Sequence, residues 1–161
     1  MKTVVAVFFF FTVVFAKEYA FIESRYSLAL DKTLIQKGTI DFGKDELVIY
    51  YDKADAKICY KEGAVELFRG GGRVELDTSQ EISLAKLFGI LLKLYNNNEA
   101  YLEAFFTISK KPGVVIYTAK EKLKGYVTSI EKYSSAGEVK KITIFLTNGD
   151  ILSLEIEHEV S

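Results

Sequence analysis

Residues 140–157 read KKITIFLTNGDILSLEIE. Within 152–157 apolar and polar residues alternate one by one, which is the period of a β-strand with one face buried and the other in water. Residues 140–147 form a second strand, and Asn148-Gly149 between the two is typical of a two-residue type I′ hairpin turn. The stretch therefore predicts an antiparallel β-hairpin with one dry and one wet face.

The same two-residue period recurs from residue 26 onward. Turn-forming residues separate the alternating runs, among them Glu62-Gly63, Gly70-Gly71-Gly72 and Lys111-Pro112-Gly113. We expect about ten strands, at residues 26–30, 34–42, 47–51, 58–60, 64–68, 73–76, 105–109, 114–118, 140–147 and 150–157.

Residues 78–95 depart from this pattern and carry a wide apolar stripe at helical spacing. Thr78 and Glu81 fit a capping box at the start of a helix, and the run Asn96-Asn97-Asn98 ends it. We expect a shorter helix at 99–104 and a helical turn at 119–124. The sequence thus predicts an α+β protein, a strongly curved antiparallel sheet with two or three helices on one face.

Such a sheet has more inward apolar positions than the expected helices cover. It can wrap into an incomplete β-barrel whose cavity holds an apolar ligand beneath a helical lid. It can equally close over a fully packed core, as a structural or interaction protein would. Periodicity alone leaves both open.

The composition limits the function. The 161 residues are 49% hydrophobic and 27% charged, which is typical of one globular domain. Lys and Arg total 21 against 22 Asp and Glu, so no net positive charge favours a nucleic-acid partner. One His and one Cys supply too few ligands and nucleophiles for most metal or catalytic sites. We therefore expect no enzyme, no cofactor and no metal; a hydrolase using Asp52 and Asp55 is the weakest alternative.

The first sixteen residues differ from the rest. A basic start is followed by an almost wholly apolar run, residues 4–15, and then by Ala16 and polar residues. This is the layout of a secretory signal peptide, and we expect cleavage after Ala16. Because the run is shorter than a membrane-crossing helix, an uncleaved anchor is the weaker interpretation. Residues 17–161 then form a single exported domain.

Several spacings also resemble a known family. The residues that carry the resemblance are Phe21-x-Glu23-x-Arg25-Tyr26, Gly38 to Phe42, Leu47 to Tyr51, Ile58 to Tyr60, Leu84 to Leu94, Glu99-x-x-Leu102-x-x-Phe105-Phe106, Val139-x-x-Ile142-x-Ile144 and Asn148 to Asp150. Their order is similar to that of the periplasmic outer-membrane lipoprotein carriers (LolA-like), and closer to the branch associated with lipid or glycolipid export.

The resemblance implies an incomplete β-barrel closed by helices, working as a monomeric carrier in the periplasm of a Gram-negative bacterium. It implies a cargo of lipid or lipoprotein acyl chains, an inner-membrane export machinery as donor, an outer-membrane acceptor and no catalysis. Lys44 stands where family carriers have an Arg that bonds to the lid, and Lys cannot reproduce the forked contact of Arg. Asp45 and Val48 also depart from the carrier pattern and favour the lipid-export branch.

We expect the cavity to be lined by alternate residues of the sheet and by the inner face of the long helix. The candidates from the sheet are Leu28, Phe42, Val48, Tyr50, Leu67, Leu76, Ile144, Leu152 and Leu154. Those from the helix are Leu87, Phe88 and Leu91. Each methylene buried there is worth about 0.8 kcal/mol relative to water.

Overall fold

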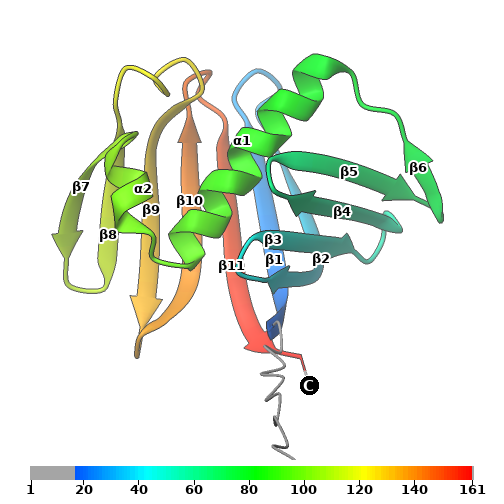
Figure 1. The fold of residues 1–161 in the computed structure, drawn as a ribbon, viewed down its shortest axis with the longest axis horizontal. Coiled ribbons are helices and arrows are strands. Elements are labelled where there is room, and N and C mark those ends of the chain that lie inside the picture. Colours follow the sequence, from blue (N-terminus) through cyan, green and yellow to red (C-terminus); the bar gives the residue numbers. More distant parts are fainter. Residues whose placement is uncertain (1–16, 161) are drawn as a thin grey trace, which may run out of the picture.

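The computed structural model describes residues 17–160 (Figure 1). They form one sheet of eleven strands and two helices. The first strands are β1 (Lys17–Ser27), β2 (Lys32–Phe42), β3 (Glu46–Tyr51), β4 (Ala56–Lys61), β5 (Ala64–Arg69) and β6 (Gly72–Val74). Helices α1 (Thr78–Tyr95) and α2 (Glu99–Glu103) follow. The remaining strands are β7 (Phe106–Lys111), β8 (Val114–Ala119), β9 (Val127–Ser135), β10 (Glu138–Leu146) and β11 (Ile151–Glu159).

The first and last strands meet in the middle of the sheet. The strand order is β6-β5-β4-β3-β2-β1-β11-β10-β9-β8-β7, and every neighbouring pair is antiparallel. The chain therefore builds one wing outward from β1, crosses through α1 and α2, and builds the other wing inward to β11. Within the described residues β6 and β7 are unpaired edges, so the sheet stays open.

The sheet is strongly curved, and α1 runs diagonally across one face of it. In Figure 1 the strands β3 to β5 lie nearly crosswise to β8, β9 and β10. Gly38 permits a close approach inside this bend, because a Cβ atom there would lie 1.8 Å from the carbonyl oxygen of Tyr50. Gly89 does the same for α1, where a Cβ would lie 2.9 Å from the hydroxyl of Tyr60 on β4.

The core lies between α1 and the sheet. Nearly every strand contributes alternate side chains to it, and the helix contributes residues 88, 90–92 and 94. At the far end of α1 the rings of Phe42 and Tyr95 stack with centroids 3.8 Å apart and planes 3° apart. The largest fully buried side chains are Tyr117, Phe21, Phe106, Ile40, Leu47, Leu92, Leu94, Leu102, Ile130, Ile142 and Ile144.

The expected α+β architecture, the long helix and the final hairpin are confirmed, with local corrections. Within the described residues there are two helices; Ala119 ends β8, and 121–126 forms turns instead of a third helix. The capping box is built by Asp77 and Gln80, one residue before the pair expected. In the final hairpin only Gly149 of the pair has a positive φ, and Leu146 pairs across the turn with Asp150, so the turn is not type I′. The proposed signal peptide, residues 1–16, lies outside the described residues.

Candidate ligand-binding groove

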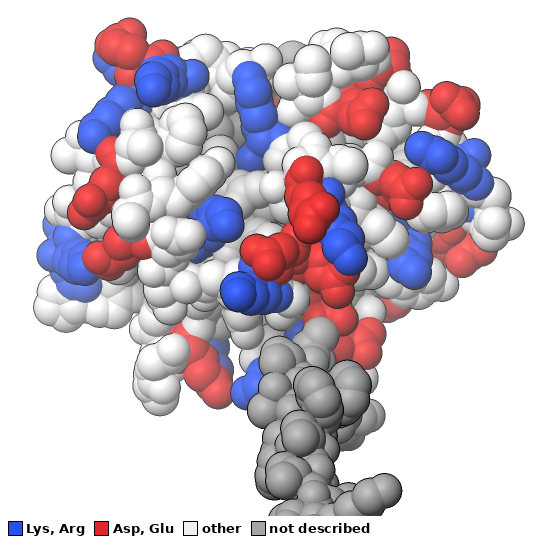
Figure 2. All heavy atoms as spheres, in the orientation of Figure 1, with Lys and Arg blue, Asp and Glu red and all other residues white. Residues whose placement is uncertain are grey.

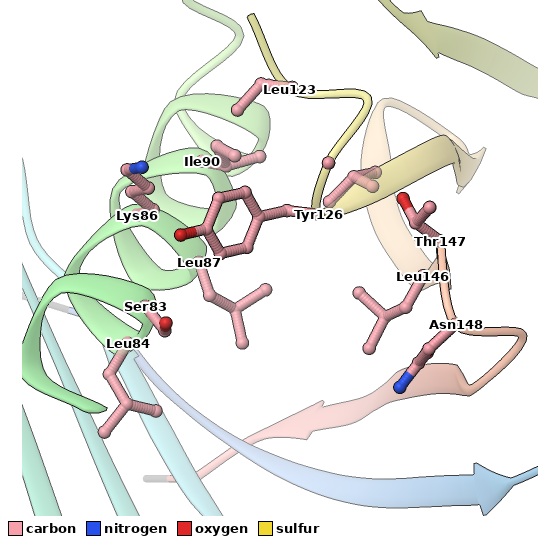
Figure 3. A pocket seen from close by; sticks show the side chains of 12 residues that line it. Ser83, Leu84, Lys86, Leu87, Ile90, Leu123, Tyr126, Leu146, Thr147 and Asn148 are labelled. Carbon is pink, nitrogen blue, oxygen red and sulfur yellow. The ribbon is translucent and has the colours of Figure 1, made fainter. Parts of the chain in front are cut away.

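An apolar groove of about 320 Å³ opens beside the middle of α1 (Figure 3). One wall is the helix, and the other is formed by the segment that leads into β9 and by the turn between β10 and β11. In Figure 3 the side chains of Leu87 and Leu146 project into the space from opposite sides. The lining residues are Ser83, Leu84, Lys86, Leu87, Ile90, Leu123, Gly125, Tyr126, Val127, Leu146, Thr147 and Asn148.

Hydrogen bonds hold the sheet-side wall together. The amide of Thr147 donates to the carbonyl oxygen of Tyr126 at 3.0 Å, and its hydroxyl donates to that of Lys124 at 2.7 Å. Leu123 is 6% exposed and ties the same segment to the core. Two loops that are distant in sequence are thereby fixed as one surface facing α1.

The groove suits a hydrocarbon chain better than a polar ligand. Its lining is mostly apolar, and its volume lies at the lower end of the range of about 300 to 1,000 Å³ that is usual for small-molecule sites. Lys86 is its one charged lining residue, and the ammonium lies 4.5 Å from the ring centroid of Tyr126. This cation–π contact joins the two walls at the rim.

Directly beneath α1 the interior is packed. The remaining gap measures about 10 Å³, the space of roughly one water molecule. It is lined by Glu23, Arg25, Ile49, Leu87, Phe88, Leu91, Ile142, Ile144, Leu152 and Leu154. A hydrocarbon chain does not fit there in this structure, and the open apolar space lies beside the helix rather than under it.

A polar cluster interrupts this packed interior. The phenol of Tyr51 donates to Glu23 Oε2 at 2.7 Å, and Arg25 Nε donates to Glu23 Oε1 at 2.5 Å. Glu23 is 4% exposed, whereas the Arg25 side chain is 50% exposed. Burial by itself would lower the pKa of the Arg25 guanidinium, but the Glu23 carboxylate outweighs that effect and keeps this pKa above its ordinary value. Burial, reinforced by the Glu23 carboxylate, raises the pKa of the Tyr51 phenol.

The structure gathers half of the expected cavity residues around the packed gap. Six of them line it: Leu87, Phe88, Leu91, Ile144, Leu152 and Leu154. Only Leu87 also reaches the open groove. Leu67 and Leu76 are half-buried against the core elsewhere, and Phe42 is buried under Tyr95.

Three expected positions need correction. Val48 and Tyr50 lie on the face of the sheet opposite α1, because β3 turns Leu47, Ile49 and Tyr51 inward instead. Both sets are apolar or aromatic, so alternation along β3 does not distinguish them. Leu28 falls in the turn after β1, where it is 56% exposed.

Lys44 lies beside the end of α1, but the contact is made by its backbone carbonyl oxygen and not by its side chain. The side-chain amide of Asn96 donates to the carbonyl oxygens of Gly43 and Lys44, at 3.2 and 3.1 Å. The backbone of residue 44 thus meets the helix end, and the identity of its side chain plays no part in these bonds.

Most groove residues escaped the sequence analysis. The sheet-side wall comes mostly from loops and strand ends, which carry no periodicity, and Tyr126 and Asn148 each look like ordinary exposed loop residues. The helix side did carry a signal. The apolar stripe of α1 is wider than one buried face. Leu84 and Ile90, at the side of this stripe, line the groove.

Charges of both signs are interspersed over the face that bears α1, with uncharged areas between them (Figure 2). Within residues 17–160, no group of three or more His, Cys, Asp or Glu side chains is placed to hold a metal ion. In the same part of the chain, neither helix has the length and apolar character needed to cross a membrane.

Similarity to known proteins is found among solved structures. No protein-family model matches the sequence, and no curated protein matches it. Among solved structures, the chain is similar to the crystal structure of the LolA superfamily protein NE2245 from Nitrosomonas europaea. The two are 9% identical, with a TM-score of 0.44, over 89% of this chain and 84% of that one. The export-associated branch stays a prediction.

Proposed function

We propose that this protein is a non-catalytic carrier that holds the hydrocarbon chain of a lipid or lipoprotein in the groove beside α1. The observation that supports the proposal best is the groove itself, an apolar space of about 320 Å³ between a helix and two tethered loops. An acyl chain placed there leaves water while its polar end stays outside, and each sheltered methylene contributes about 0.8 kcal/mol.

The packed space beneath α1 bears on how much chain the protein can hold. The groove alone shelters part of a long acyl chain; a longer stretch requires α1 to move away from the sheet. The Gly89 contact with Tyr60 and the ring stack of Tyr95 on Phe42 lie toward the far half of the helix. We propose that the segment before Gly89, which supplies four of the five helix residues that line the groove, is the part that gives way.

The wider setting is proposed on the sequence. An N-terminal export signal would place the protein in the periplasm, where a monomeric carrier could receive acyl chains from an inner-membrane machinery and pass them to an outer-membrane acceptor. Transfer of this kind needs a donor and an acceptor, because an acyl chain gains little on leaving one apolar environment for another.

A second candidate function follows from the filled interior. With only about 10 Å³ free under α1, the domain also suits a solid interaction protein of the envelope whose groove binds no lipid. Uptake of a hydrocarbon probe separates the two.

The test is a titration of the purified protein with a fluorescent long-chain fatty acid. We expect saturable uptake, lost in large part in the double variant Leu87→Gln and Leu146→Gln, which places an amide on each wall of the groove. Ile82→Gln is the matched control, because Ile82 lies on the same helix, is 48% exposed and does not line the groove. Absence of uptake by the unmodified protein, or equal uptake by the groove variant, would contradict the carrier proposal.

A further inference from the structure

Arg25 occupies an unusual place for a half-exposed charge. It lies on the helix-facing side of β1 in the middle of the sheet, opposite Leu152 of β11 and Leu34 of β2 in the strand register. It lines the gap beneath α1 together with Leu87, Phe88 and other apolar side chains. A cation at the edge of an apolar interior can bind an anion through charge-assisted hydrogen bonds, which are stronger there than in water.

The guanidinium is only partly engaged. Its Nε donates to Glu23 and the Tyr51 phenol lies close to the group, while within residues 17–160 its two terminal nitrogens form no salt bridge. A planar guanidinium can offer such a pair of nitrogens to two oxygens of one carboxylate or phosphate. Half of the side chain is exposed, so an anion can reach them.

Glu23 and Tyr51 fix the orientation of this group. Glu23 is buried and is itself held by the Tyr51 phenol at 2.7 Å, so the carboxylate is a rigid partner for Nε. The guanidinium is thereby held in one orientation. Prior ordering of this kind lowers the entropy lost when a ligand binds.

The position relative to the groove determines the class of ligand. Leu87 lines both the gap that contains Arg25 and the open groove, so the two spaces adjoin at this side chain. We propose that Arg25 binds the anionic head group, a carboxylate or phosphate, of an amphiphile whose hydrocarbon chain lies in the groove. This inference rests on the proposed carrier function and adds a selectivity to it.

Three probes with the same oleoyl chain test the proposal: oleate, oleoyl lysophosphatidate and uncharged monoolein. Titration calorimetry gives the affinity of each for the unmodified protein and for Arg25→Gln. We expect the substitution to weaken binding of the anionic probes about tenfold or more, and that of monoolein less than about twofold. A larger loss for lysophosphatidate than for oleate assigns the site to a phosphate head group, and the reverse assigns it to a carboxylate.

Removing Arg25 alone leaves the buried Glu23 charge without its cationic partner, which could unfold the protein. A second variant therefore separates a loss of binding from a loss of folding. The double variant Glu23→Gln and Arg25→Gln keeps polar side chains at both positions without a buried charge, and circular dichroism verifies its folding. Arg73→Gln is the matched control, because Arg73 on β6 likewise pairs with one carboxylate, that of Glu66, at 3.6 Å. It should leave all three affinities unchanged.

Equal affinity of the unmodified protein for oleate and monoolein, or an equal loss for all probes in Arg25→Gln, would overturn the anionic site and leave the carrier function standing. If none of the three probes binds, the carrier function itself fails, and the head-group site fails with it.

Discussion

The phenol oxygen of Tyr51 on β3 lies 2.7 Å from the Oε2 atom of Glu23 on β1, beneath the helix that crosses the sheet. The two strands are not neighbours, since β2 lies between them. The hydrogen bond therefore spans the curved face and gives the buried carboxylate a second partner besides Arg25. A buried carboxylate needs such partners because its desolvation is costly.

Replacing Tyr51 by Phe should lower the free energy of unfolding by about 1 to 3 kcal/mol, since one oxygen of the buried Glu23 carboxylate then lacks its donor. Urea unfolding measures the change. Tyr50→Phe is the control on the same strand, because Tyr50 is 39% exposed and its hydroxyl, among residues 17–160, bonds only to the exposed Asp55 at 3.1 Å. That variant should stay within about 0.5 kcal/mol of the unmodified protein. Equal effects at the two positions would contradict a special role for the buried phenol.

The contact between the end of α1 and the β2–β3 turn is expected to depend on Asn96 and not on Lys44. Asn96→Ala removes the amide that donates to two carbonyl oxygens and should cost about 0.5 to 1.5 kcal/mol of unfolding free energy. Lys44→Ala retains the accepting carbonyl and should change stability by less than about 0.5 kcal/mol. Thermal unfolding of both variants provides the comparison; a larger loss for Lys44→Ala would indicate that its side chain has a structural role after all.

Gly38 should not tolerate a side chain. An added Cβ would meet the backbone carbonyl oxygen of Tyr50 at 1.8 Å, and a backbone atom cannot swing aside as a flexible side chain can. We expect Gly38→Ala to destabilise the protein by more than about 3 kcal/mol or to prevent folding. Gly72→Ala, in the edge strand β6, is the control, because the nearest atom to its Cβ would be 3.8 Å away. Soluble yield and urea midpoints distinguish them, and a stable Gly38→Ala would show that β2 can straighten.

The final hairpin and the long helix could be predicted because each carries its own periodic signal. In β11, Leu154 and Ile156 alternate with acidic residues, so only one assignment of faces buries the apolar set. On β3 both faces carry apolar or aromatic residues, and curvature together with the position of α1 decides that Ile49 faces inward and Tyr50 outward. No local pattern in the sequence contains that information.

The groove was harder still to predict. It arises where Leu87 of the helix faces Leu146 and the loop around Tyr126, and these segments come together only through the crossover from one wing of the sheet to the other. The two loops of its sheet-side wall are joined by backbone hydrogen bonds such as Thr147 to Tyr126, which any residue except proline could make. The spatial neighbours are therefore set by topology, and residue type reveals little of them.

Alkaline pH should destabilise the domain through Tyr117. Its ring is 1% exposed, and burial raises the pKa of its phenol to about 12, above the ordinary value of 10.0. The folded state thus holds this proton more tightly than the unfolded state, so its contribution is complete below pH 10 and is lost as the pH rises through about 12. The free energy of unfolding of the unmodified protein, relative to that of Tyr117→Phe, should be constant up to about pH 9.5. It should then fall by about 2 kcal/mol by pH 12. Urea unfolding at half-unit steps of pH measures it, and a difference that stays constant to pH 12 would mean that the phenolate is accommodated without unfolding.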